Sequence, residues 1–212
     1  RGARRVIAVS DGVAGRARDL GARDVTVVPN GVRVPEAVAA GVPEGFPTCG
    51  GPVFVYAGTV AQWLAPEIFV DAFERARARL GDARLVFVGQ GSGWDALAER
   101  SCGVTGVEMI PAVSAEEADR WMARATATLA SLRPGGYDYA YPTKILASLA
   151  QGTPVIYAGP GQAASDVRDA GLGVACSLDA SQVAEAMVAF ASDAVTWAGA
   201  EGVRAWVRAH RS

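Results

Sequence analysis

Residues 142–156 read PTKILASLAQGTPVI, and this stretch decides the fold. Pro142 suits the first turn of a helix, and the apolar spacing that follows predicts a helix over Thr143–Ala150. The β-branched residues of Val155–Tyr157 then predict a buried strand. A helix followed directly by such a strand is the repeating unit of a parallel sheet.

The same pattern of short apolar strands and amphipathic helices extends from this stretch in both directions. The predicted strands are Val6–Val9, Val25–Val28, Val53–Tyr56, Arg84–Val88, Val107–Ile110, Thr126–Ala130, Val155–Tyr157 and Gly173–Cys176. Segments of helical length separate most of them, and a last helix is predicted over Val195–His210. We therefore expect an α/β fold with a doubly wound, Rossmann-like parallel sheet.

The segment between the second and third predicted strands is rich in proline and glycine, which interrupt regular structure. We predict a linker over residues 34–51. Residues 1–33 are then expected to be the C-terminal remnant of a preceding domain. Residues 52–212 are expected to form a complete domain of their own.

Composition and charge exclude several classes of protein. The 212 residues are 50% hydrophobic and 20% charged, which is typical of a globular chain. A formal net charge of −2 excludes the broad basic face that nonspecific nucleic-acid binding needs. No apolar run reaches the ~18 residues of a membrane span, so we expect no transmembrane segment.

Cysteine and histidine usage narrows the chemistry further. Cys49, Cys102 and Cys176 are widely spaced, and the only histidine, His210, lies near the end of the sequence. We therefore expect no disulfide framework, no metal site and no Ser-His-Asp triad. Lys144 is the only lysine beside many arginines, a bias typical of GC-rich genomes, and we expect a bacterial, cytoplasmic protein.

Lys144 lies in the first turn of a predicted helix, immediately after a loop that follows a buried strand. In an open α/β sheet this is the carboxyl edge, where ligands bind. A first turn disfavours cations by ~0.3–1 kcal/mol, so a lysine there is explained if a phosphate lies between it and the helix. The alternative is a side chain that points into solvent at negligible cost.

The loop before Lys144 holds further candidates. Arg133 is either a ligand of phosphate or carboxylate or a solvated side chain. Asp138 has a functional interpretation, in which it accepts hydrogen bonds from sugar hydroxyls or acts in catalysis. The alternative is that it caps a turn. Tyr137, Tyr139 and Tyr141 form either a stacking wall for a sugar or base or an extended, half-buried segment.

Glycines follow two of the predicted strands. Gly58 comes after Val53–Tyr56, and Gly89 and Gly91 come after Arg84–Val88. Glycine at these points permits a close approach of the backbone to a ligand, and a tight turn is the alternative. Gly89 and Gly91 resemble the start of a G-x-G-x-x-G dinucleotide-binding fingerprint, but Trp94 occupies the position of its third glycine.

Four segments in this order resemble the C-terminal half of GT-B glycosyltransferases of family 4. They are residues 27–32 (VVPNGV), 55–59 (VYAGT), 83–91 (ARLVFVGQG) and 142–156. The resemblance covers nearly the whole chain and implies the donor-binding domain of a retaining sugar transferase. Its donor would be a nucleotide-diphosphate sugar, either a UDP-sugar or a GDP-sugar, and it would need no metal or other cofactor.

The resemblance also implies that an N-terminal domain binds the acceptor, which is a sugar, a lipid or a small molecule. We expect that domain to be missing here apart from residues 1–33. The chain alone is then expected to be incomplete as a catalyst. Acceptor, sugar and nucleoside are not readable from these motifs.

The family's donor site maps onto several positions of this sequence. A glycine and its successor approach the sugar and phosphates, a loop contacts the base, and a helix start binds the diphosphate through backbone N–H groups. The matching residues are Gly58 and Thr59, Ile110 and Pro111, and Thr143 and Lys144, respectively.

The chain also departs from the family pattern. The family's E-x7-E pair falls on Tyr139 and Ala147, and no cation occurs in residues 59–63. We expect Arg133 and Lys144 to take over donor binding, with Tyr139 beside them and Asp138 as the candidate catalytic residue.

These losses leave two other functions open. A degenerate GT-B-type domain would serve as a noncatalytic binding or interaction module, because a fold does not by itself confer activity. A sugar-nucleotide epimerase of the same fold would need further charged and histidine groups in the cleft.

Overall fold

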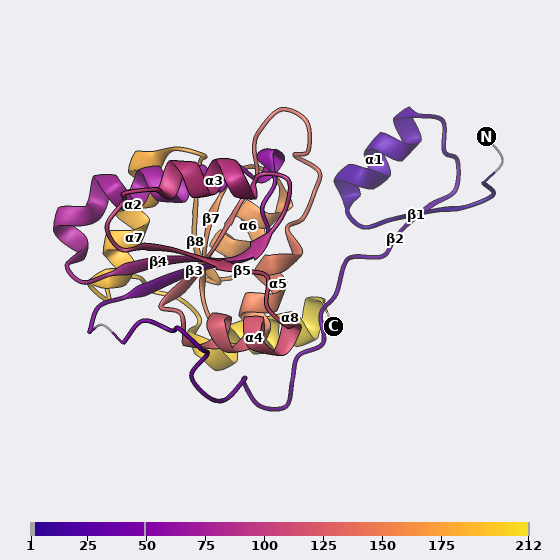
Figure 1. Cartoon of the computed structure of the whole chain (residues 1–212). Helices are drawn as coiled ribbons and strands as arrows, with labels where there is room; N and C mark the ends of the chain where they lie inside the picture. The colour runs from indigo at the N-terminus through magenta and orange to yellow at the C-terminus, as the bar shows by residue number, and fades with distance from the viewer. Residues whose placement is uncertain (1–2, 49, 212) are drawn as a thin grey trace.

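The computed structural model describes residues 3–48 and 50–211, so Cys49 lies outside the described residues. Its main sheet has six parallel strands in the order β5-β4-β3-β6-β7-β8 (Figure 1). These are β3 (Val53–Thr59), β4 (Arg84–Gln90), β5 (Val107–Pro111), β6 (Ala127–Ser131), β7 (Val155–Ala158) and β8 (Gly173–Cys176). The chain winds outward from β3 to β5, then returns to β6 and winds outward to β8. This confirms the doubly wound sheet, and the reversal between β3 and β6 is its topological switch point.

The sheet is buried on both faces. Along β3, Phe54 and Tyr56 belong to one hydrophobic cluster, whereas Val53 and Val55 belong to another. All four side chains are buried, which explains why the strand reads as a continuous apolar run rather than as an alternating one.

Helices cover both faces (Figure 1). The cluster around Phe54 is covered by α2 (Glu67–Leu80), α3 (Trp94–Ser101) and α7 (Ala180–Ala191). The other face is covered by α4 (Ala115–Arg124), α5 (Thr143–Ala150), α6 (Gln162–Asp169) and α8 (Gly199–His210). The last helix begins at Gly199, later than the predicted Val195, and the N–H of its N-cap residue Ala198 donates to the carbonyl of Gly171 at 2.8 Å.

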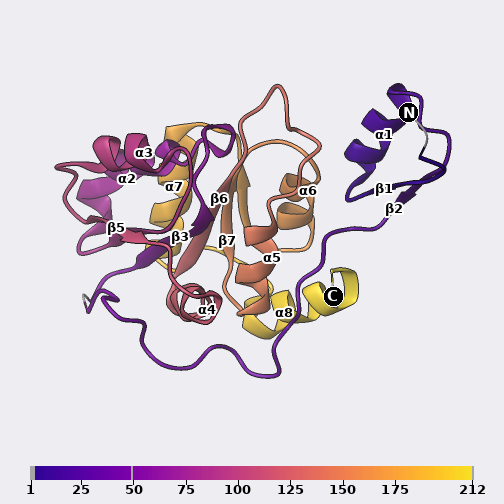
Figure 2. The same ribbon diagram turned by 45° about the vertical axis from the view of Figure 1, so that its right-hand side comes forward.

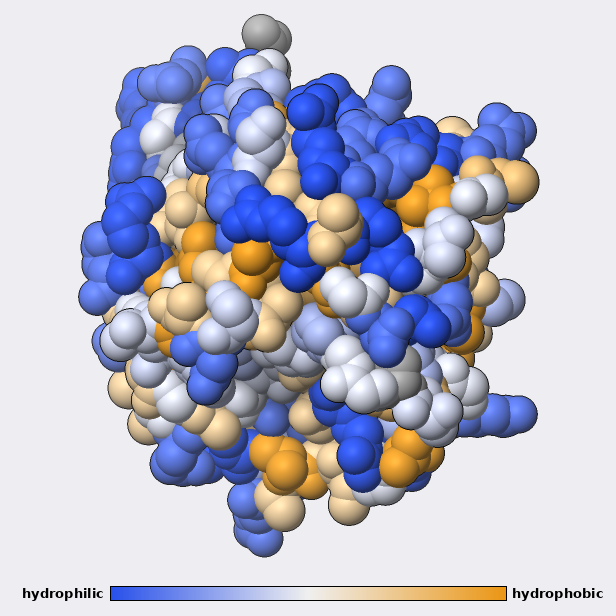
Figure 3. Space-filling view, turned by 90° about the vertical axis from the view of Figure 1, so that its left-hand side faces the viewer, coloured by the Kyte–Doolittle hydropathy of each residue, from blue (hydrophilic) through white to orange (hydrophobic). Residues whose placement is uncertain are grey.

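Helices α2 and α7 pack side by side and are joined by an ion pair between Arg79 and Glu185. Figure 3 views the molecule from the side on which these two helices lie at the left of Figure 1. Hydrophobic residues appear there as separate patches among hydrophilic ones.

A small lobe precedes the main sheet. It consists of β1 (Val6–Ala8), α1 (Asp11–Asp19) and β2 (Val25–Val27), whose two strands pair in parallel (Figure 2). The hydroxyl of Ser10 caps α1 and also donates to the carbonyl of Tyr139 at 2.7 Å. This bond connects the lobe to the loop before α5. Ile7 and Leu20 remain 67% and 74% exposed.

The described chain between β2 and β3 contains no helix or strand and runs along the α4, α5 and α8 side of the main sheet (Figure 2). Val32 donates to the carbonyl of Arg211 at 2.7 Å, and Ala39 donates to Oε1 of Gln151 at 2.9 Å. Among the described residues, no helix is long and apolar enough to cross a bilayer. The thiols of Cys102 and Cys176 are both free.

Candidate functional site

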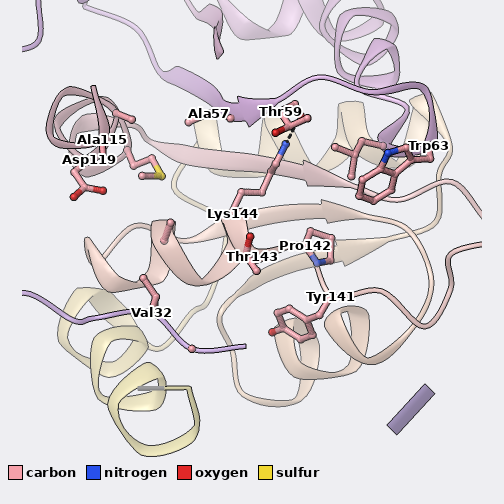
Figure 4. A pocket seen from close by; sticks show the side chains of 16 residues that line it. Val32, Ala57, Thr59, Trp63, Ala115, Asp119, Tyr141, Pro142, Thr143 and Lys144 are labelled. Atoms are coloured by element: carbon pink, nitrogen blue, oxygen red, sulfur yellow. Dashed lines mark hydrogen bonds between the residues drawn. The ribbon is translucent and has the colours of Figure 1, made fainter. Parts of the chain in front are cut away.

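A cleft of about 540 Å³ opens at the switch point, between the carboxyl end of β3 and the start of α5 (Figure 4). Strand β3 contributes Ala57, Gly58 and Thr59, and helix α5 contributes Thr143, Lys144 and Ala147. Further lining residues come from α4 (Ala115, Ala118, Asp119 and Met122) and from loops (Gly31, Val32, Trp63, Leu64, Tyr141 and Pro142). A ligand in this cleft would therefore contact both halves of the doubly wound sheet.

Lys144 extends from α5 across the cleft toward β3 (Figure 4). Its ammonium donates to the carbonyl of Thr59 at 3.0 Å and lies 3.5 Å from the centroid of the Tyr56 ring. The side chain is half-buried, and burial lowers the pKa of Lys144 to about 7. The solvent-facing alternative is therefore wrong for this lysine.

No capping side chain or acidic residue of α5 neutralises the positive end of its helix dipole. Pro142 occupies the N-cap position without a side-chain hydrogen bond, and the first turn holds no acidic residue. Helix α4, by contrast, is capped by Ser114, whose hydroxyl accepts from the N–H of Glu117 at 3.1 Å. The N–H groups and dipole at the start of α5 thus remain available to an anion in the cleft.

Gly58 allows the backbone of β3 to come close to Lys144. Its φ is +115°, and a Cβ added there would lie 3.9 Å from Cε of Lys144. Gly89, its partner in the next strand, could carry no Cβ, because that atom would lie 2.0 Å from the carbonyl oxygen of Gly58. The two glycines bring the ends of β3 and β4 together beside the cleft.

The structure thus brings four of the residues predicted for the site into one cleft: Gly58, Thr59, Thr143 and Lys144. Ile110 and Pro111 lie at the end of β5, the outermost strand on that side of the sheet, and do not line this cleft. Their role toward a base stays a prediction.

Arg133 and Asp138 have partners of their own in the loop. Arg133 donates to Glu67 at 2.6 Å and to the carbonyl of Gln62 at 3.2 Å, and it lines a separate cavity of about 340 Å³. One carboxylate oxygen of Asp138 accepts from the N–H of Gly135 at 2.9 Å, which is the turn-capping arrangement. Their predicted roles toward a donor stay predictions.

The aromatic residues of the loop do not form one continuous wall. Tyr141 is 9% exposed and lies under the guanidinium of Arg211, 4.8 Å from it. Tyr137 packs against Tyr139 at 6.2 Å and against Trp63 at 5.4 Å, measured between ring centroids. The exposed series therefore includes Trp63, a residue that the sequence interpretation did not single out.

The sequence interpretation also did not identify Asp119 as a residue of the site. It lies on α4 near Ala115 (Figure 4), and both residues line the cleft together with Met122 of the same helix. The sequence does contain one sign of its position. Asp119 lies four residues after Ala115 and three before Met122, a spacing that places all three side chains on one face of a helix. Burial raises the pKa of Asp119 above its usual value.

Comparison with protein families supplies the classification. The family model of glycosyl transferases group 1 matches residues 51–193. The chain belongs to this family. In this group 1 glycosyltransferase chain, the matched residues run from just before β3 to just after α7 and include every wall of the cleft except Gly31 and Val32. No curated protein matches the chain significantly.

Solved GT-B structures show the same fold as this group 1 chain. Anabaena Alr3699/HepE in complex with UDP and glucose has a TM-score of 0.80 and 17% identity, over 99% of this chain and 60% of its own. The lipopolysaccharide outer core galactosyltransferase WaaB has a TM-score of 0.70 and 19% identity, over 99% and 58%. WaaG, a glycosyltransferase involved in lipopolysaccharide biosynthesis, has a TM-score of 0.72 and 18% identity, over 95% and 58%. The chain therefore spans about three fifths of the length of these structures and corresponds to the C-terminal half of the fold.

Proposed function

We propose that this chain is the donor-binding domain of a retaining glycosyltransferase and that its cleft holds a UDP-sugar or a GDP-sugar. The observation that carries the proposal is Lys144, which lies in the uncapped first turn of α5 and reaches across the cleft to the end of β3. A cation and a positive helix end that face the same space repel each other unless an anion separates them. A diphosphate fits that description.

The chemistry of the reaction explains why these groups lie there. When the glycosidic bond of the donor breaks, negative charge develops on the departing diphosphate. The ammonium of Lys144 and the backbone N–H groups of Thr143 and Lys144 would stabilise that charge without needing to reorganise. Gly58 would let the diphosphate approach the backbone of β3, since a larger residue would reduce the space opposite Lys144.

The sugar end of the donor would lie toward the loop before α5. Asp138 is our candidate catalytic residue there, and it would use Oδ2, because Oδ1 is bonded to Gly135. Arg133 and Tyr139 belong to the same loop and would reach the donor only if the loop moves, since Arg133 is paired with Glu67. The base would extend toward Ile110 and Pro111.

Nucleotide binding tests this proposal directly. Calorimetry at low salt should detect binding of UDP or GDP. Lys144→Ala should weaken it by ~1.5–3 kcal/mol, the usual value of a hydrogen bond to a charged group, and Lys144→Arg should restore only part of the loss. Arg79→Gln, which removes a cation paired on the α2 and α7 face, is the matched control and should bind as the parent does. No binding at millimolar nucleotide overturns the proposal.

We further propose that transfer to an acceptor needs a surface that packs on the small lobe. The exposed side chains of Ile7 and Leu20 are the apolar surface of the lobe that such a contact would cover. The chain alone, given donor and a range of acceptors, should yield only background hydrolysis. Robust transfer by this chain contradicts the proposal.

A noncatalytic binding module is the second candidate. It is supported by the residues at the family's carboxylate positions, Tyr139 and Ala147, which carry no acid. Thermal melts with a panel of nucleotides separate the two candidates, because a ligand at 100 times its Kd stabilises by about 2.7 kcal/mol. Stabilisation by nucleotides favours the donor-binding domain, whereas its absence favours the interaction module.

A further inference from the structure

Asp119 is the one acidic side chain among the described residues that line the cleft. It projects from α4, whereas Lys144 projects from α5, so the two charges enter the cleft from neighbouring helices (Figure 4). The other lining residues of α4 are apolar (Ala115, Ala118 and Met122), and Ala147 of α5 lines the cleft as well. The cleft thus presents a cation from α5 and a separate hydrogen-bond acceptor from α4.

The carboxylate of Asp119 lies beside the amide of Gln151. Oε1 of Gln151 accepts from the N–H of Ala39 at 2.9 Å. Gln151 is 5% exposed, so its amide is fixed by packing and by the linker. Within residues 3–48 and 50–211, no cation forms an ion pair with Asp119. Its remaining acceptor positions are therefore open to the cleft.

The spacing along α5 fits a nucleotide. Ala147 lies three residues after Lys144, about 4.5 Å farther along the helix axis at 1.5 Å per residue. A ligand whose diphosphate rests at Lys144 would place its next unit beside Ala147, where the small side chain leaves room opposite α4. In a nucleoside diphosphate that unit is the ribose, which carries two neighbouring hydroxyl donors.

We propose that Asp119 accepts hydrogen bonds from the ribose hydroxyls of the donor nucleotide, while Lys144 holds its diphosphate. This inference rests on the proposed function. Asp119 is then a specificity residue that favours ribonucleotides over deoxyribonucleotides.

Calorimetry with UDP, 2′-deoxy-UDP and inorganic pyrophosphate tests this inference on the parent, Asp119→Asn and Asp119→Ala. We expect the parent to bind UDP about 10- to 100-fold more tightly than 2′-deoxy-UDP, because a hydrogen bond to a charged acceptor is lost. Both variants should lose about the same factor for UDP, less for 2′-deoxy-UDP, which keeps only the 3′-hydroxyl, and little for pyrophosphate. Glu116→Gln, an exposed carboxylate of the same helix, is the control and should bind UDP as the parent does.

Each other outcome has a defined meaning. If the Asp119 variants bind UDP as tightly as the parent, this inference is overturned and the proposed function stands. An equal loss for UDP and 2′-deoxy-UDP means that the carboxylate contacts the base or acts through its charge, which also overturns it. If the parent binds neither UDP nor GDP, the proposed function fails and this inference fails with it. Retained pyrophosphate binding shows that a variant is folded.

Discussion

The ammonium of Lys144 lies 3.5 Å from the centroid of the Tyr56 ring. The lysine comes from α5 and the tyrosine from β3, so the contact joins the two halves of the sheet at their switch point. An aromatic face attracts a cation by ~0.5–2 kcal/mol, but the same burial removes water from the amine and lowers the pKa of Lys144 to about 7. At neutral pH this environment therefore holds the amine near the balance between its charged and neutral forms.

This balance is measurable because Lys144 is the only lysine in the sequence. The rate at which an amine-acylating reagent modifies it should rise with pH around a midpoint near 7, instead of the usual value of about 10.4. Saturating UDP should slow the modification and move the midpoint upward, because a diphosphate favours the charged amine. Lys144→Met supplies the background from the α-amino group. A midpoint above 10 in the parent contradicts the burial described above.

Stability should depend on pH through the same group. The pKa of Lys144 is lower in the folded chain than in the unfolded chain, so between about pH 7 and 10.4 the unfolded state binds more protons. The free energy of unfolding of the parent should therefore rise with pH across that window relative to Lys144→Met, and the difference should be constant below it. Denaturant melts of both proteins at several pH values give the comparison. A difference that falls with rising pH would contradict the sign.

The sequence predicts the sheet well because burial on both faces leaves an unambiguous apolar pattern. The end of β3 shows the limit of that pattern. Residues 57–59 read as a turn after Tyr56, yet they continue the strand, because Gly58 pairs with Gly89 and Thr59 with Gln90. The strands stay paired to their ends because the facing positions 58 and 89 are both glycine, and a single strand considered alone does not contain that information.

The site was predicted only in part, for a similar reason. The role of Lys144 could be inferred from the local chemistry of a helix start. Arg133, by contrast, is paired with Glu67, which is 66 residues away, and Asp119 faces the cleft because α4 packs against α5. Both facts depend on how distant segments pack together. The sequence gives no sign of the Arg133 pairing, and for Asp119 it gives only the helical spacing that places it beside apolar residues.

Gly89→Ala should destabilise the fold at the edge of the cleft. Its Cβ would lie 2.0 Å from the carbonyl oxygen of Gly58, so β3 and β4 would have to separate. We expect a loss of ~1–3 kcal/mol or more in the free energy of unfolding, the usual cost of overpacking. Gly136→Ala is the matched control, because no atom lies within 4 Å of its added Cβ, and it should change stability by less than ~1 kcal/mol. Equal denaturant midpoints for the two variants would show that the strand ends can move apart freely.

Ala147→Glu should change the ionisation of Lys144. Position 147 lines the cleft three residues after Lys144 on α5, a spacing at which two helical side chains are neighbours. A carboxylate there favours the charged amine, and an opposite charge within reach commonly moves a pKa by 1–3. The midpoint of lysine modification should therefore rise to about 8 or above, whereas Ala147→Gln, which adds similar volume without charge, should leave it near 7. A midpoint that is the same in both variants would mean that the side chain at position 147 does not share the cleft with Lys144.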